Sequence, residues 1–74
     1  MSFPEERKRE KYYTLRQITI LWLGNINFYT RVYRRFVREY RKGRAGIINI
    51  ANGKRNLALL VAESTVKAVL GIRP

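Results

Sequence analysis

The chain of 74 residues contains no cysteine, no histidine and no aspartate, and its only serines are Ser2 and Ser64. Without cysteine, neither a disulfide nor a thiolate metal site can form. Without histidine and aspartate, no Ser-His-Asp or Cys-His arrangement can be assembled, and the usual ligand set of a zinc site is missing. The common nucleophilic and zinc-dependent chemistries are therefore excluded by composition.

Acidic residues are also scarce. The five acids are all glutamates, and Glu5, Glu6 and Glu10 fall in one charged run, which does not suggest a pair of catalytic carboxylates. The phosphate-binding patterns GxxxxGK[ST] and GxGxxG do not occur. We therefore expect the protein not to be an enzyme, and we expect no catalytic residue, no metal and no cofactor.

The positive charge is large by comparison. Sixteen Lys and Arg residues stand against the five glutamates, which gives a formal net charge of +11 at pH 7. Eleven of the sixteen are arginines, and the planar guanidinium group matches the geometry of phosphate oxygens better than an ammonium group does. Such a one-sided charge favours nucleic acid, anionic lipid or an acidic protein as a partner.

The hydrophobic stretches are short. The N-terminus runs into charged residues instead of an apolar core, so we expect no signal peptide. The most apolar stretch, Ile18 to Leu23, is far too short to cross a bilayer. We therefore expect no transmembrane segment.

The length allows one small domain with a modest core, and the sequence predicts an all-α fold. The expected plan is a bent helical hairpin in residues 1–74, packed in an oligomer. It consists of a long kinked N-terminal helix, a turn that contains glycine and an apolar C-terminal helix. Its segments are a charged and then apolar segment 1–23, a basic amphipathic helix 25–42, a turn 43–54 and an apolar helix 55–70.

Two segments leave alternatives open. Residues 12–23 carry β-branched and aromatic residues typical of a strand, but their apolar residues also follow helical spacing, and we favour a helix with a kink or break at Gly24. In residues 47–53, Asn52 and Gly53 are compatible with a tight hairpin between IINI and RNLAL, or Asn52 is the cap of the last helix. We favour the helical option.

The segment RVYRRFVREYRK, from Arg31 to Lys42, holds six cations and one acid. At 100° per residue the six cations fall within an arc of about 120°. The opposite side carries Val32, Tyr33, Phe36, Val37 and Tyr40, preceded by Ile26 and Tyr29. We expect the rings of Tyr29, Tyr33, Phe36 and Tyr40 to pack inward and not to form a stacking platform for bases.

The C-terminal segment 55–70 is apolar around most of a helical wheel, with Glu63 and Lys67 spaced for an i,i+4 ion pair. A helix of this kind must be buried around most of its girth, which one partner helix cannot do. The pattern therefore predicts contacts with neighbouring subunits in a homo-oligomer or filament.

The arginine-rich segment RVYRRFVREYRKGR and the apolar segment LALLVAESTVKAVLG give the chain an overall plan that resembles the small helical capsid nucleoproteins of rod-shaped and filamentous archaeal viruses. The resemblance implies an all-helical protein that coats double-stranded DNA with its positive face and packs against its neighbours with its apolar face. It also implies a place in a virion or in an intracellular nucleoprotein.

We therefore predict a structural protein that coats or packages DNA through non-specific phosphate contacts and assembles with itself. The predicted contact residues are the six cations of the helical face and, as secondary candidates, three cations in or next to the following turn: Arg31, Arg34, Arg35, Arg38, Arg41, Lys42, Arg44, Lys54 and Arg55. Double-stranded DNA is the favoured partner. The alternatives are a small basic subunit of a ribosome or another complex that binds RNA, and a helical subunit on a membrane surface.

Overall fold

The computed structural model describes residues 10–71, and it has an α+β fold with three strands as well as helices. The elements are β1 (Tyr12–Thr14), α2 (Leu15–Leu23), the 3-10 helix η1 (Ile26–Phe28), α3 (Tyr29–Arg41), β2 (Ile47–Asn49), β3 (Leu59–Ala62) and α4 (Glu63–Leu70). The strands form one antiparallel sheet in the order β1-β3-β2. The prediction of an all-α helical hairpin is therefore wrong.

The N-terminal part is a strand followed by a helix, not one long kinked helix. Thr14 ends β1 and caps α2: its hydroxyl accepts the backbone N–H of Gln17, and the Gln17 side chain accepts the N–H of Thr14. This reciprocal pair is a capping box, which fixes the start of a helix. At Gly24 the chain takes a left-handed conformation with φ of 70° and α2 ends, so Gly24 is a break. The part of the predicted N-terminal helix before residue 10 lies outside the described residues.

The predicted helix 55–70 is divided between a loop, a strand and a short helix. Residues 59–62 form β3, which pairs with both other strands, and only residues 63–70 are helical. The apolar run is explained by this position, because a central strand is buried against its neighbours in the sheet and against the helices. The predicted ion pair is present, with Lys67 Nζ 3.7 Å from Glu63 Oε2.

The alternative of a hairpin between IINI and the following segment is closer to the structure than the helical option. β2 and β3 are antiparallel neighbours, with Ile48 opposite Leu60. The turn is not a tight Asn-Gly turn, however: residues 50–58 form a wide loop, closed by a 2.8 Å hydrogen bond from the Ile50 N–H to the Ala58 carbonyl.

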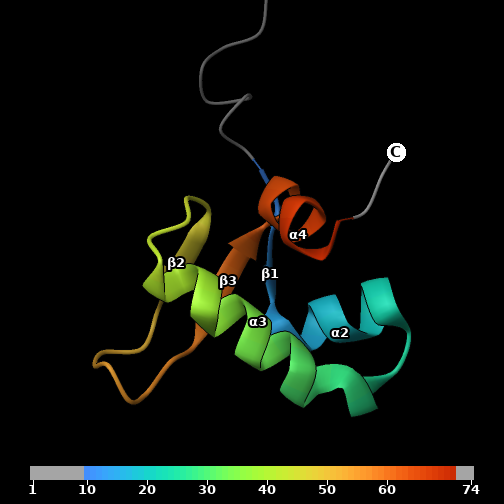
Figure 1. The fold of residues 1–74 in the computed structure, drawn as a ribbon, viewed down its shortest axis with the longest axis horizontal. Helices are drawn as coiled ribbons and strands as arrows, with labels where there is room; N and C mark the ends of the chain where they lie inside the picture. The colour runs from blue at the N-terminus through green and yellow to red at the C-terminus, as the bar shows by residue number, and fades with distance from the viewer. Residues whose placement is uncertain (1–9, 72–74) are drawn as a thin grey trace, which may run out of the picture.

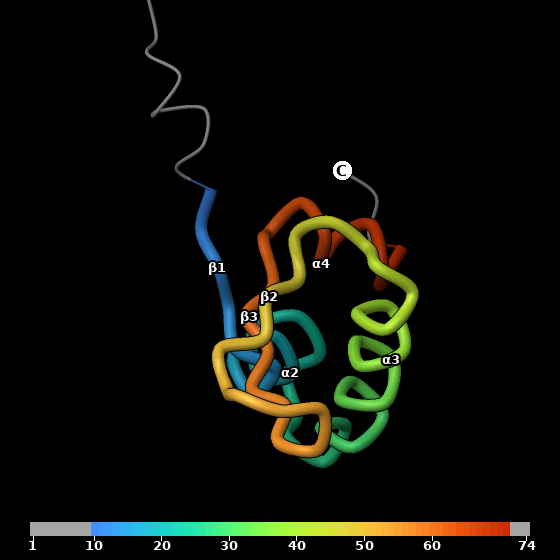
Figure 2. The backbone as a smooth tube through the Cα atoms, turned by 90° about the vertical axis from the view of Figure 1, so that its left-hand side faces the viewer, coloured from blue at the N-terminus to red at the C-terminus, as the bar shows by residue number. Residues whose placement is uncertain are grey.

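The molecule has two layers (Figures 1 and 2). The sheet forms one side and α3 the other, while α2 and α4 fill the space between them at opposite ends. The core lies between the layers. Its buried side chains are Leu15, Ile18, Val32, Phe36, Val37, Ile47, Leu59, Val61, Val66 and Val69. These residues come from all three helices and from β2 and β3, so the helices are held in place by the sheet.

The two faces of the sheet differ. Val61 lies opposite both Tyr13 and Ile47, and these side chains face the helices; Leu60 lies opposite both Thr14 and Ile48, and this row faces outward. Ile48 is 46% exposed, and Ile50, just after the strand, is 61% exposed. Among the described residues, no helix covers this outer face of the sheet.

Residues before β1 fix the start of α4. Ala62 has no side chain that can cap the helix, and the Glu10 carboxylate accepts the Ser64 N–H at 2.7 Å in its place. Hydrogen bonding with the Ser64 side chain, together with this contact to its backbone N–H, lowers the pKa of Glu10. The Tyr13 hydroxyl donates to Glu63 Oε1 at 2.9 Å, which raises the pKa of Tyr13.

Candidate nucleic-acid interface

α3 separates charge from apolar surface along its whole length. Arg31, Arg34, Arg35, Arg38, Arg41 and Lys42 are all exposed, whereas Val32, Phe36 and Val37 are buried. The helical period explains this arrangement, because residues three and four apart share a face. We call the six cations the basic face. At about 1.5 Å per residue it extends roughly 17 Å along the helix axis.

The aromatic residues of this region mostly pack as predicted. Phe36 is fully buried, and Tyr33 and Tyr40 are half-buried against the core. Tyr29 is the exception, since it is exposed and stacks on Tyr33 with ring centroids 6.2 Å apart. Ile26 is also exposed, so the apolar side of the helix is buried from Val32 onward and not before.

Three cations of the basic face have partners within the protein. The Arg31 guanidinium lies 5.7 Å from the centroid of the Phe28 ring. Arg35 donates to the Val69 carbonyl at 3.3 Å and so joins α3 to the C-terminal end of α4. Lys42 Nζ lies 3.8 Å from the carboxylate of Glu39.

The side chains of the other three cations, Arg34, Arg38 and Arg41, form no ion pair or hydrogen bond with any residue in the described range 10–71. Two shallow hollows run beside them. One, of about 560 Å³, includes Arg31, Arg34, Arg35 and Arg38 in its lining, and the next, of about 530 Å³, includes Arg34, Arg38, Arg41 and Lys42. No acidic side chain lines either hollow, so both suit an anion.

Glu39 is the one acid on α3, and it is turned inward with 7% of its surface exposed. The Arg44 side chain forms an ion pair and a hydrogen bond with it. That hydrogen bond, helped by the charges of Arg44, Lys42 and Arg35, holds the pKa of Glu39 below its ordinary value although its burial acts the other way. The acid therefore stays ionised, and its charge is paired with Arg44 and with Lys42 at the C-terminal end of the helix.

Arg44 also ends α3 through its backbone. Its N–H donates to the Glu39 carbonyl at 3.1 Å, and the Gly43 N–H donates to the Tyr40 carbonyl at 3.0 Å. This pair of hydrogen bonds is the Schellman motif that satisfies the last carbonyls of a helix. Arg44 is thus engaged within the fold, and its role as a phosphate contact is less well supported than that of the basic face.

The loop 50–58 brings one predicted residue close to the basic face. Lys54 lies beside Arg41 in a hollow of about 700 Å³, whose wall also includes Asn49 and Gly53. Asn49 orders the loop, because its Oδ1 accepts the N–H groups of Ala51 and Ala58, each at 3.1 Å. Arg55 is exposed on the same loop, but it does not line this hollow.

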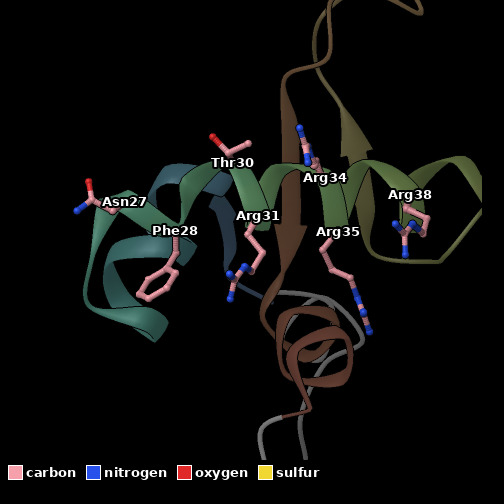
Figure 3. Close-up of a pocket in the computed structure, with 7 residues that line it drawn as sticks. All are labelled: Asn27, Phe28, Thr30, Arg31, Arg34, Arg35 and Arg38. Carbon is pink, nitrogen blue, oxygen red and sulfur yellow. The ribbon is translucent and has the colours of Figure 1, made fainter.

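The sequence prediction missed the residues that continue the basic face at its N-terminal end. Asn27, Phe28 and Thr30 line the same hollow as Arg31 and Arg34. Figure 3 shows Phe28, Arg31 and Arg35 extending to one side of α3, and Thr30 and Arg34 to the other. Counting 100° per residue backward from Arg31 places Asn27 inside the cationic arc and Phe28 beside it. The helical period alone could therefore have added these two residues to the predicted interface.

Comparisons with protein-family models, with curated proteins and with solved structures find no match to this chain. Within residues 10–71, none of the helices has the length and apolar character needed to cross a membrane. The resemblance to archaeal viral nucleoproteins was based on a chain that is helical throughout. The protein contains a three-stranded sheet, so the two no longer share an all-helical plan, and that plan no longer supports the resemblance.

Proposed function

We propose that the protein binds nucleic acid without sequence specificity, with double-stranded DNA as the favoured ligand, and acts as a structural coat or packaging protein. The observation that carries the proposal is the composition of the basic face: six exposed cations on one rigid helix, with the only acid of that helix turned inward. A protein surface that serves only solubility carries charges of both signs. The exposed cations of the basic face are all positive, which favours a role in binding an anionic partner.

The geometry favours contacts to the phosphate backbone. The cations of the basic face are spread over about 17 Å of helix and can meet successive phosphates, and such contacts position a protein without reading base sequence. α3 is also fixed in place, since Val32 and Phe36 anchor it in the core and Arg35 ties it to α4. A pre-ordered row of donors loses little conformational entropy on binding.

Self-assembly is part of the proposal, and its support lies in the sheet and not in the C-terminal segment, whose apolar residues are used in the protein's own core. The outer face of the sheet carries the exposed Ile48 and Ile50 on the side opposite to α3. Copies that met through this face would leave every basic face free for nucleic acid. We expect DNA binding to precede assembly, because a net charge of +11 opposes association until phosphates neutralise it.

The test is the salt dependence of binding to a duplex of mixed sequence. If all six cations of the basic face contact phosphates, the logarithm of the affinity falls with the logarithm of the salt concentration at a slope of about −5. Replacing Arg34, Arg38 and Arg41 by glutamine removes the three cations that have no internal partner. The slope should then become shallower by about 3, since each phosphate contact contributes roughly 0.9.

A matched control removes the same amount of charge elsewhere. Three other cations are exposed away from α3: Lys11 just before β1, Arg16 on α2 and Lys67 on α4. Their replacement by glutamine changes the net charge equally. We expect this variant to keep most of the original slope. A slope that changes equally in both triple variants would mean that only net charge matters, and an affinity that ignores salt would exclude the proposal.

Two further ligands separate the proposal from its alternatives. A-form RNA duplex of the same length should bind no more tightly than DNA, because phosphate contacts dominate; a strong preference for RNA would instead indicate an RNA-binding subunit. Vesicles that contain an anionic lipid should be displaced by DNA. Vesicle binding that survives excess DNA would indicate a membrane-surface protein.

A further inference from the structure

Another hollow lies next to the basic face, and more of its lining residues are apolar than in the hollows described above. It is bounded by the end of α2, by the junction of η1 with α3 and by the end of α4, and its volume is about 500 Å³. Its walls are mostly apolar, and the only charged groups are two arginines. The lining residues are Leu23, Phe28, Arg31, Val32, Arg35, Val69 and Leu70.

Phe28 connects this hollow with the basic face. Its ring lines both the apolar hollow and the hollow beside Arg34 and Arg38, and 37% of the residue is exposed. The Arg31 guanidinium lies near the ring, and Figure 3 shows both side chains extending to the same side of α3. An exposed ring with a cation beside it is the arrangement on which nucleic-acid bases stack in proteins that bind single strands.

The two arginines are placed at the mouth of the apolar hollow. Arg35 is held there by its hydrogen bond to the Val69 carbonyl, and Arg31 by its contact with Phe28. A guanidinium group has five N–H donors, so each keeps donors for a further acceptor. The hollow thus offers an apolar space with cations at its rim, and about 500 Å³ falls within the size range of small-ligand sites.

We propose that this hollow accepts an unpaired base from a nucleic acid bound along the basic face. The base would lie against the Phe28 ring and the apolar wall, with the flanking phosphates on Arg31 and Arg35. A base has an apolar face and is joined to a phosphate on either side, which matches an apolar hollow with a cationic rim. The inference rests on the proposed function, and it adds that a single strand or an unpaired base makes a contact in this hollow that a fully paired duplex does not make.

The test compares a fluorescently labelled oligothymidine strand with a DNA duplex of equal length. Phe28→Leu keeps an apolar side chain and removes the ring, so we expect a loss of roughly 5- to 150-fold in affinity for the single strand, the range given by base–aromatic stacking. Duplex affinity should fall far less, because a paired base does not enter the hollow, and the salt slope should change little, because the substitution removes no charge. The matched control is Ile26→Ala, because Ile26 belongs to the same 3-10 helix and is similarly exposed but lines neither hollow.

A second measurement does not depend on the variant. A strand that carries one 5-iodouracil, bound to the unmodified protein and irradiated, should crosslink to Phe28, as located by mass spectrometry of the peptides. Crosslinks only to other residues would overturn the inference, as would a single-strand affinity that Phe28→Leu leaves unchanged.

The outcomes also distinguish the inference from the proposed function. If both ligands bind with a steep salt dependence and Phe28→Leu affects neither, the basic face binds phosphates and only the base site is refuted. If neither ligand shows salt dependence, the proposed function fails as well. If Phe28→Leu weakens binding to anionic lipid vesicles and leaves binding to the oligothymidine strand intact, the hollow serves a lipid, and the inference is also refuted.

Discussion

Replacing Gly46 by alanine tests the α+β fold at a point where the structure makes a specific demand. Gly46 precedes β2 with φ of 88°, and a Cβ atom added there would lie 2.0 Å from Thr65 Oγ1 on α4. Thr65 is buried, and its hydroxyl donates to the Ala45 carbonyl at 3.0 Å. The substitution therefore strains the backbone and also pushes Thr65 away from its hydrogen-bond partner.

The size of the effect follows from these contacts. A left-handed conformation costs a residue other than glycine about 1–2 kcal/mol. Overpacking a filled site typically costs about 1–3 kcal/mol, and a lost hydrogen bond costs about 1 kcal/mol. We expect Gly46→Ala to lower the free energy of unfolding by roughly 3–6 kcal/mol, which is a large share of the stability of a small domain.

Gly43 provides the matched control. Its φ is 82°, and nothing lies within 4 Å of the position of an added Cβ, so Gly43→Ala should cost only the backbone term of about 1–2 kcal/mol. A Thr65→Ala background removes the contact with Oγ1 and leaves the Cβ of residue 65 at 3.1 Å and the Ala62 Cβ at 3.4 Å, so Gly46→Ala should then cost less than in the original sequence but still more than Gly43→Ala. Urea unfolding followed by the fluorescence of Trp22 gives all of these values. Equal costs for the two glycines in the original sequence would refute the reasoning, since they would place Gly46 in an open turn.

Three further predictions concern the core, the acid of α3 and the loop. Phe36→Ala should destabilise the protein by about 3–5 kcal/mol, because its fully buried ring leaves a cavity; a cost below about 1 kcal/mol in urea unfolding would contradict its place in the core. The lowered pKa of Glu39 contributes stability that is present above the ordinary carboxyl pKa of 4.5 and is lost as the pH falls through the lower pKa of the folded protein. Glu39→Gln should therefore flatten the decline in stability below pH 4.5, and unchanged pH profiles would mean that its pairing with Arg44 contributes nothing. Asn49→Ala should increase hydrogen exchange at the Ala58 N–H, which Asn49 Oδ1 accepts, while α3 stays protected; unchanged exchange would show that the loop is ordered by other contacts.

The basic helix could be predicted from sequence because its information is local. Thirteen residues, Tyr29–Arg41, form α3 inside the predicted range 25–42, and the helical period alone assigns each side chain to a face. The C-terminal end of α3 also follows from its neighbour in sequence, because Gly43 adopts a positive φ there. Gly24 ends α2 in the same way. The capping box of Thr14 and Gln17 was readable in the same way, but it was overlooked.

The sheet could not be predicted by the same means. In β3 the apolar run Leu59–Ala62 continues directly into α4, and a central strand buried by its neighbours has no alternation that separates it from a helix. Its partners lie far away in sequence: Ala62 is opposite Tyr12 and Val61 is opposite Ile47. Pairings over such distances depend on tertiary contacts that no local pattern contains.

The same division holds for the candidate site. Sequence could place Arg35 and Arg44 among the cations, but it could not show that Arg35 donates to the Val69 carbonyl or that Arg44 pairs with Glu39. It could not bring Lys54 next to Arg41 either, because the course of the loop 50–58 is set by the hydrogen bonds of Asn49. The charge of a helical face is a local property of the sequence, whereas the internal partners of each cation depend on the tertiary fold.

The most direct measurement of the central claim is a titration of isotope-labelled protein with a DNA duplex, followed by the NMR signals of each backbone amide and of each arginine Nε–H. With a duplex too short to hold two copies, we expect the largest changes along α3, with the Nε–H signals of Arg34, Arg38 and Arg41 foremost. Ile48 and Leu60, on the outer face of the sheet through which copies would meet on longer DNA, should change little. Changes centred on that outer face, with the arginines of α3 unaffected, would contradict the account.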